Sequence, residues 1–144
     1  MVRWCKPRQP WRRIIVDPAA LSDVAIRGIG MVGRDNDGSI FLTMARRFDG
    51  RFSVEIAEAL TIIYAVREAS SRGLSSVEFE SDAQRVVNLI NLEEVLFNEL
   101  DSIIESIRFE NRGKNFVFLF FSRSRNTVTH KIAKFALSIA NLKI

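Results

Sequence analysis

The chain has 144 residues, of which 47% are hydrophobic, so it is long enough for one domain with a hydrophobic core. No apolar stretch approaches the roughly 20 residues of a membrane span, and the N-terminus carries no apolar signal-peptide segment. The single cysteine, Cys5, excludes an intramolecular disulfide and, with only one histidine, a Cys/His zinc cluster. We therefore expect an intracellular protein, nuclear or cytoplasmic rather than secreted, that is monomeric and has no membrane partner.

The net charge of +4 is distributed unevenly along the chain. Residues 1–16 carry five basic groups and no acid, residues 17–107 carry sixteen acids and eight arginines, and residues 108–144 carry eight basic groups and one acid. Carboxylates in the middle could hold cations while basic ends contact phosphates, a pattern that fits a metal-dependent enzyme acting on a polyanion. The alternative is that both ends are solvated surfaces, and charge alone does not decide between the two.

The first part of the chain predicts a basic leader followed by three strands. Residues 1–11, which contain tryptophan and proline among basic groups, are expected to be an extended leader or linker remnant, and residues 12–144 the folded domain. A first strand at 12–17 should stop at Pro18, because proline cannot donate to a strand ladder, and residues 18–25 should form a turn. Strands at 27–34 and 39–46 flank Asp35-Asn36-Asp37-Gly38, a strong hairpin signal.

Helices alternate with strands in the remainder. Ser53 can cap a largely buried helix that runs to about residue 72, with Gly73 as its stop. A strand at 76–80 should turn into a helix over 82–91, followed by a helix at 95–109, a strand covered on both faces at 115–121 and a last helix from 126 or 127 to 141. This order predicts an α/β fold with a five-stranded mixed sheet, three antiparallel hairpin strands plus two parallel strands, flanked by helices.

Four positions are candidates for chemistry: Asp17 and Asp82 at strand ends, Glu58 within the buried helix, and His130 in the first turn of the last helix. An acid at a strand-to-helix switch lies at the carboxyl edge of a sheet, where α/β proteins bind ligands, and a carboxylate in a buried helix requires a partner or a metal. Together they would suit a two-metal phosphodiester-cleaving site with Mg²⁺ or Mn²⁺. Taken singly, each has a simpler explanation, such as a helix cap at Asp82.

Five short motifs, in order, carry a resemblance to a known family. They are Ile14-Ile15-Val16-Asp17, Gly28 through Gly38, Ala57-Glu58-Ala59, Glu80-Ser81-Asp82-Ala83-Gln84, and Arg123-Ser124-Arg125-Asn126 through His130-Lys131-Ile132-Ala133. Together they resemble the type 1 ribonuclease H domain in the form found in plant genomes, both in retrotransposon-derived polyproteins and as small free-standing proteins. The resemblance covers residues 10–142.

The resemblance implies a catalytic site and a substrate. Asp17, Glu58 and Asp82 would occupy three of the family's four metal-binding acidic positions, and His130 the fourth. The implied reaction is hydrolysis of the RNA strand of an RNA–DNA hybrid with two Mg²⁺ ions, one activating water and the other stabilising the leaving 3′ oxygen. We therefore expect an enzyme, a hydrolase that acts on phosphodiester bonds with nucleic acid as its partner.

Three further positions are assigned to substrate binding by the same resemblance. Gln84 matches a position that contacts the hybrid in its minor groove, where the 2′-hydroxyls are exposed. Arg125 and Asn126 are placed beside the substrate with it. Residues 92–107, where some members of the family carry a basic protrusion, hold five acids and no lysine or arginine, so contacts to the hybrid must come from elsewhere.

Two alternative functions remain open at this point. Pro18 stands where the family usually has glycine, and His130 replaces a usual aspartate, although plant members often carry histidine there. These departures and the missing protrusion favour a catalytically degenerate module that still binds nucleic acid. The apolar face of the helix at 95–109 and the acidic middle of the chain fit an interaction domain with no nucleic-acid role.

Overall fold

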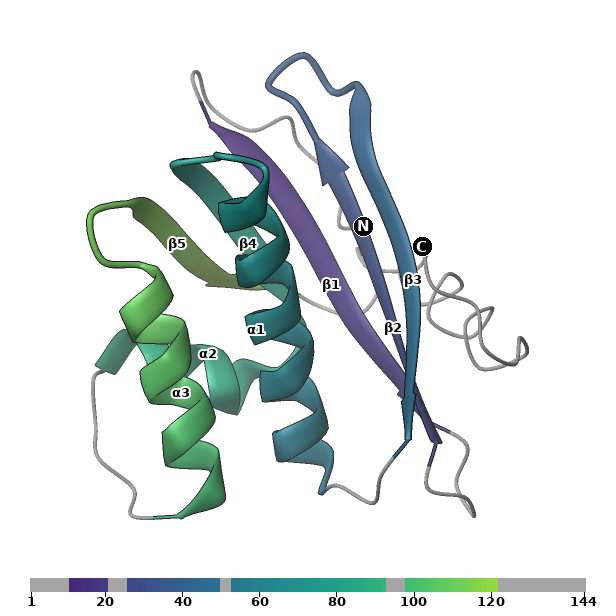
Figure 1. Ribbon diagram of the computed structural model, residues 1–144, viewed down its shortest axis with the longest axis vertical. Coiled ribbons are helices and arrows are strands. Elements are labelled where there is room, and N and C mark those ends of the chain that lie inside the picture. The colour runs from purple at the N-terminus through teal and green to yellow at the C-terminus, as the bar shows by residue number, and fades with distance from the viewer. Residues whose placement is uncertain (1–10, 21–25, 50–52, 93–97, 122–144) are drawn as a thin grey trace.

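The computed structural model describes residues 11–20, 26–49, 53–92 and 98–121 and shows a sheet with helices packed against it (Figure 1). The strands form one five-stranded sheet in the order β3-β2-β1-β4-β5, in which β1 pairs antiparallel with β2 and parallel with β4. The predicted mixed α/β fold is confirmed. The elements are β1 Arg12–Ala20, β2 Ile26–Arg34, β3 Ile40–Asp49, α1 Val54–Ser71, β4 Ser76–Ser81, α2 Gln84–Leu92, α3 Glu99–Glu110 and β5 Asn115–Phe120.

The predicted turn and helix ends are found where the sequence places them. Gly38 has a φ of 88° and donates its N–H to the carbonyl of Asp35 at 2.9 Å, which closes the β2–β3 hairpin. Ser53 accepts a hydrogen bond from the N–H of Ile56 at 3.2 Å and so caps α1. Gly73 ends the same helix with a φ of 74°. These local signals are therefore sufficient to fix the β2–β3–α1 portion.

The prediction that Pro18 stops the first strand is wrong. β1 continues to Ala20, and Pro18 lies opposite Ile29 of β2 in the antiparallel ladder. The pairing of β1 with β4 has already ended at Ile15 opposite Glu80, so from there on none of the described strands pairs with that edge of β1. A proline is tolerated at a free edge, because its missing N–H leaves no neighbouring strand unpaired. The predicted turn over 18–25 is correspondingly wrong for residues 18–20, and residues 21–25 lie outside the described ranges.

Smaller corrections apply to the second half of the chain. α2 begins at Gln84 rather than at residue 82, and α3 begins at Glu99, where Asn98 caps it by accepting from the N–H of Asp101 at 3.2 Å. β5 is an edge strand that buries Phe116 and Phe118 on one face, whereas Val117 and Leu119 on the other face are only half-buried, so the prediction of a strand covered on both faces is wrong. The predicted leader, apart from Trp11, and the last helix fall outside the described residues.

The helices α1, α2 and α3 pack on one face of the sheet, and α1 runs alongside β1 (Figure 1). The core between the layers takes alternate residues of the two central strands, Ile14 and Val16 from β1 and Val77 and Phe79 from β4. Phe79 stacks on Phe118 with ring centroids 5.4 Å apart. No helix of the described ranges is long and apolar enough to span a membrane.

Two asparagine side chains cover the outer edge of β5. The amide of Asn111 accepts from the N–H of Phe116 at 3.0 Å and donates to its carbonyl at 3.1 Å, and Asn91 donates to the carbonyl of Phe118 at 3.1 Å. Both asparagines thus occupy backbone positions that an additional strand would use. An uncharged strand of this composition at a sheet edge is prone to pair with another chain, so these contacts protect it.

Candidate functional site

The candidate acids lie near the point where the two central parallel strands part. The β1–β4 pairing ends at Ile15 opposite Glu80, and continuing that register by two residues brings Asp17 level with Asp82. Asp17 is fully buried, at 0% exposure, and lies opposite Gly30 of β2. This is the carboxyl end of the parallel pair, the usual ligand-binding edge of an α/β sheet.

Asp82 lies in a short turn between β4 and α2, and the turn is held at several points. The Ser81 hydroxyl is buried and accepts from the N–H of Ala83 at 3.1 Å, while the Ser81 carbonyl accepts from the N–H of Phe121 at 3.1 Å. The Asp82 carbonyl accepts from the N–H of Gln84, also at 3.1 Å. These bonds tie the turn to both β5 and α2, so the half-buried Asp82 side chain projects from a constrained backbone.

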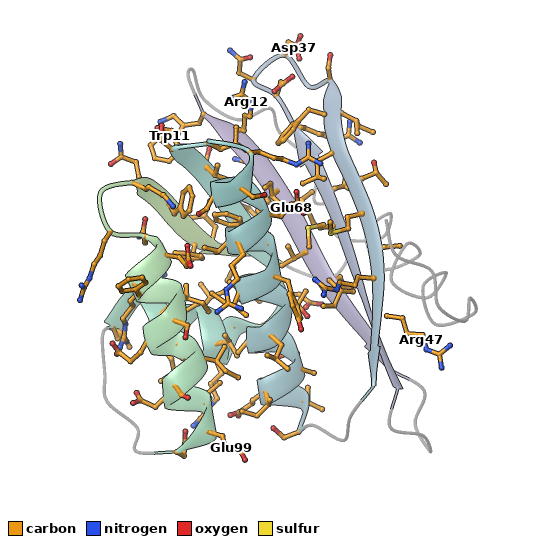
Figure 2. All side chains as sticks on the ribbon, in the orientation of Figure 1. Trp11, Arg12, Asp37, Arg47, Glu68 and Glu99 are labelled. Carbon is orange, nitrogen blue, oxygen red and sulfur yellow. The ribbon has the colours of Figure 1, made fainter. Side chains whose placement is uncertain are left out.

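Glu58 comes from the second turn of α1, which packs against β1. Its side chain is half-buried. α1 and α3 both begin at the end of the molecule where β1 ends (Figure 1). Glu99 and Arg47 lie at this end, while Arg12 and Asp37 lie at the opposite end (Figure 2). Glu58, close to the start of α1, therefore lies toward the same end as the acids of β1 and β4.

The three acids come from adjoining elements, β1, α1 and the turn between β4 and α2. Within the described part of the chain, no three histidine, cysteine, aspartate or glutamate side chains lie in an arrangement that could hold a metal ion. The oxygen donors themselves suit Mg²⁺ or Mn²⁺.

The other predicted site residues divide into one that is described and three that are not. Gln84 is the first residue of α2 and is exposed, so it is accessible to a ligand. His130, Arg125 and Asn126 lie outside the described residues. Their proposed contacts with metal and substrate stay predictions.

A buried ion cluster next to the acids was missed by sequence reasoning. Nε of Arg13 lies 2.7 Å from Oε2 of Glu80, and an η-nitrogen of Arg13 lies 3.3 Å from Oε2 of Glu78. The three side chains are at most 9% exposed. Alternation of Glu78 and Glu80 with apolar neighbours is equally typical of a solvent-facing strand. Arg13 is 65 residues from Glu78 in the sequence, so no local signal reveals the cluster.

The comparisons with known proteins agree with this fold. Residues 17–136 match the family described as reverse transcriptase-like. A search of curated protein sequences found no match. Among solved structures, ribonuclease H1 from the archaeon Halobacterium salinarum is 20% identical with a TM-score of 0.81, and the alignment covers 90% of this chain and 99% of that one.

Two further structures were determined with nucleic acid bound. A ribonuclease H1 isolated from compost, in complex with an RNA/DNA hybrid, is 21% identical with a TM-score of 0.78 and covers 88% of this chain and 96% of its own. A foamy viral protease-reverse transcriptase with an RNA/DNA hybrid is 14% identical with a TM-score of 0.68, over 94% of this chain and 22% of that one. The chain therefore belongs to the reverse transcriptase-like family, and its fold is that of the type 1 ribonuclease H domains.

Proposed function

We propose that this protein is a metal-dependent endonuclease that hydrolyses the RNA strand of RNA–DNA hybrids. The observation that carries the proposal is the position of Asp17 and Asp82, each two residues beyond the last paired residue of its strand in the parallel β1–β4 pair, in a chain of the reverse transcriptase-like family. The hybrid bound to two solved relatives of the same fold supports the choice of substrate. The basic ends of the chain are available to contact its phosphates.

Each proposed site residue has a defined part. Asp17, Glu58, Asp82 and His130 would hold the divalent cations, Mg²⁺ or alternatively Mn²⁺. When bound, such cations supply a Lewis acid and lower the pKa of bound water at the scissile phosphate. The buried position of Asp17 and the hydrogen-bonded turn at Asp82 support this role, because a ligand held by rigid backbone loses little conformational entropy on binding.

Gln84 would contact the sugar edge of the hybrid from the start of α2, with Arg125 and Asn126 beside it. The amide of Gln84 can both donate to and accept from a 2′-hydroxyl. That hydroxyl distinguishes RNA from DNA, so the contact would contribute to the choice of strand. The exposed position of Gln84 two residues after Asp82 supports this assignment.

The test is cleavage of a labelled hybrid in Mg²⁺ and in Mn²⁺ by the wild-type protein and by Asp82→Asn. The substitution keeps the shape of the side chain but removes its charge, and we expect the rate to fall by about 10³-fold, equivalent to several kcal/mol of transition-state stabilisation. The matched control is Asp37→Asn, an exposed carboxylate at the opposite end of the molecule, which should cleave like the wild type (Figure 2). Equal rates for Asp82→Asn and the wild type would refute the proposal.

A degenerate nucleic-acid-binding module is the second candidate. It is favoured by Pro18 beside Asp17 and by the absence, within the described residues, of a closed three-ligand metal group. This candidate predicts salt-dependent binding of the hybrid without metal-dependent cleavage. Hybrid binding measured at two salt concentrations, next to the cleavage assay, separates the two candidates.

A further inference from the structure

The buried ion cluster of Arg13, Glu78 and Glu80 joins the two strands that carry the candidate acids. Arg13 lies directly opposite Glu78 in the parallel ladder, and its Nε contacts Glu80, one same-face position further along β4, at 2.7 Å. The side chain of Glu80 has 0% exposure, and those of Arg13 and Glu78 have 9% and 5%. A guanidinium held between two buried carboxylates of the neighbouring strand is therefore the main charged contact across this pair.

The cluster lies on the same face of the strands as Asp17. Successive side chains alternate between the faces of a strand, so Arg13, Ile15 and Asp17 share one face of β1. Glu80 lies opposite Ile15 at the last paired position and is two residues from Asp82 along β4. The Glu80 end of the ion cluster thus lies one same-face step from the level of Asp17.

The apolar pattern alone leaves the register of β1 and β4 incompletely specified. The ladder has four paired positions, from Arg12 opposite Val77 to Ile15 opposite Glu80. A slip of one residue would turn the apolar side chains to the wrong face, but a slip of two would keep every side chain on its own face. A two-residue slip would move Asp82 by about 6.6 Å along the sheet relative to Asp17.

The ion cluster selects between these registers. A slip that places Arg13 opposite Ser76 carries Glu80 away from the guanidinium and leaves a fully buried carboxylate without that contact. Breaking a buried ion pair costs about 3–5 kcal/mol, and buried polar groups are best attested as devices that specify register. The opposite slip places Arg13 opposite Glu80 with Glu78 at the diagonal position, so the cluster disfavours one of the two slipped registers, the one that brings Asp17 opposite Glu80.

We propose that Arg13 and Glu80 are positioning residues, which fix the β1–β4 register and thereby hold Asp17 and Asp82 level for catalysis. This inference rests on the proposed function for its catalytic consequence, although the register itself can be measured without activity. The residues act through the strands and touch neither metal nor substrate. Their contribution is to selectivity among registers rather than to net stability, since buried ion clusters are often no more stabilising than apolar side chains of similar volume.

The test replaces the whole cluster by apolar residues, in the triple variant Arg13→Met, Glu78→Leu and Glu80→Leu. We expect the triple variant to melt within a few degrees of the wild type, because no buried charge is left unpaired. Its kcat on the hybrid should fall about 10- to 100-fold with KM within twofold, as misplacement of catalytic groups predicts. Cross-strand NOEs between residues 13 and 78 and between 15 and 80 should weaken or be joined by NOEs from the slipped register.

The matched control removes an exposed ion pair of the same chemistry. Arg72 and Glu68 on α1 lie 2.9 Å apart within one helix, and the double variant Arg72→Met, Glu68→Leu should leave kcat, KM and the NOEs unchanged. If the triple variant does not fold, the exchanged pair Arg13→Glu, Glu78→Arg takes its place. That variant retains an ion pair across the strands and should keep kcat within about threefold of the wild type if register is what the pair supplies.

The outcomes separate the two claims. A triple variant with wild-type kcat and wild-type NOEs would overturn the positioning role. An inactive wild type would refute the proposed function, and the NOEs alone would then decide whether the cluster sets the register. An exchanged pair that folds but loses activity as the triple variant does would also count against the inference.

Discussion

The two faces of the central strands β1 and β4 differ in chemistry, although alternate residues of the same two strands build them. One face places Ile14, Val16 and Phe79 against the helices, in a continuous apolar core. The opposite face carries Arg13 and Asp17, along with the two glutamates of β4, all buried. The apolar face is non-directional and tolerates small shifts, whereas the charged face requires particular partners at particular positions. The contrast suggests a division of roles within one pair of strands: the apolar face supplies most of the stability, and the charged face carries the groups proposed for chemistry.

Phe79→Ala tests the apolar face and should have the largest effect. The side chain is 2% exposed and packs between Phe116 and Phe118, so its removal leaves a cavity between β4 and β5. We expect a loss of about 3–5 kcal/mol in the free energy of unfolding, measured by chemical denaturation. The KM of the protein that remains folded should be close to that of the wild type. A loss below about 1 kcal/mol would show that this face does not carry the core.

Asp17→Asn tests the charged face. It should lower activity without lowering stability, the opposite of what Phe79→Ala should do. Removal of a ligand charge should lower kcat on the hybrid by about 10³-fold. The free energy of unfolding should stay the same or rise, because a fully buried carboxylate is replaced by a neutral amide of the same shape. Kinetics and denaturation on the same sample provide the comparison. A variant that loses stability and activity in parallel would contradict the separation of the two faces.

Much of the fold follows from local sequence, and less of the site does. The hairpin at Asp35–Gly38 and the cap at Ser53 act within a few residues, so pattern and turn chemistry predict them. Pro18 misleads because its tolerance depends on where β4 leaves β1, a tertiary fact. The burial of Glu80 depends on Arg13 far away in the chain, and such a pairing has no local sequence signal. The sequence marks Asp17 and Asp82 as candidates because each follows a predicted strand. Whether they lie at the same level of the sheet depends on the register between β1 and β4, which the sequence does not show.

Asn111→Ala tests the outer edge of β5 and should have the smallest effect of the three substitutions, because it changes neither the core nor the candidate site. The substitution removes two hydrogen bonds to Phe116 and should cost about 1–2 kcal/mol. It also frees backbone groups at the edge of an uncharged strand, so self-association should increase with concentration. Light scattering across a concentration series would detect this. A variant that stays monomeric at every concentration would show that Asn111 does not protect the edge.

The central claim is that the acids at the parting of β1 and β4 support metal-dependent cleavage, and cation removal tests it most directly. Purified protein would be incubated with a hybrid labelled on its RNA strand, first in Mg²⁺, then with excess chelator, then with Mg²⁺ restored. The account predicts cleavage of the RNA strand that stops on chelation and resumes on restoration, with no cleavage by Asp17→Asn under any of the three conditions. Hybrid binding without cleavage in Mg²⁺ and in Mn²⁺, or cleavage that persists in chelator, would contradict it.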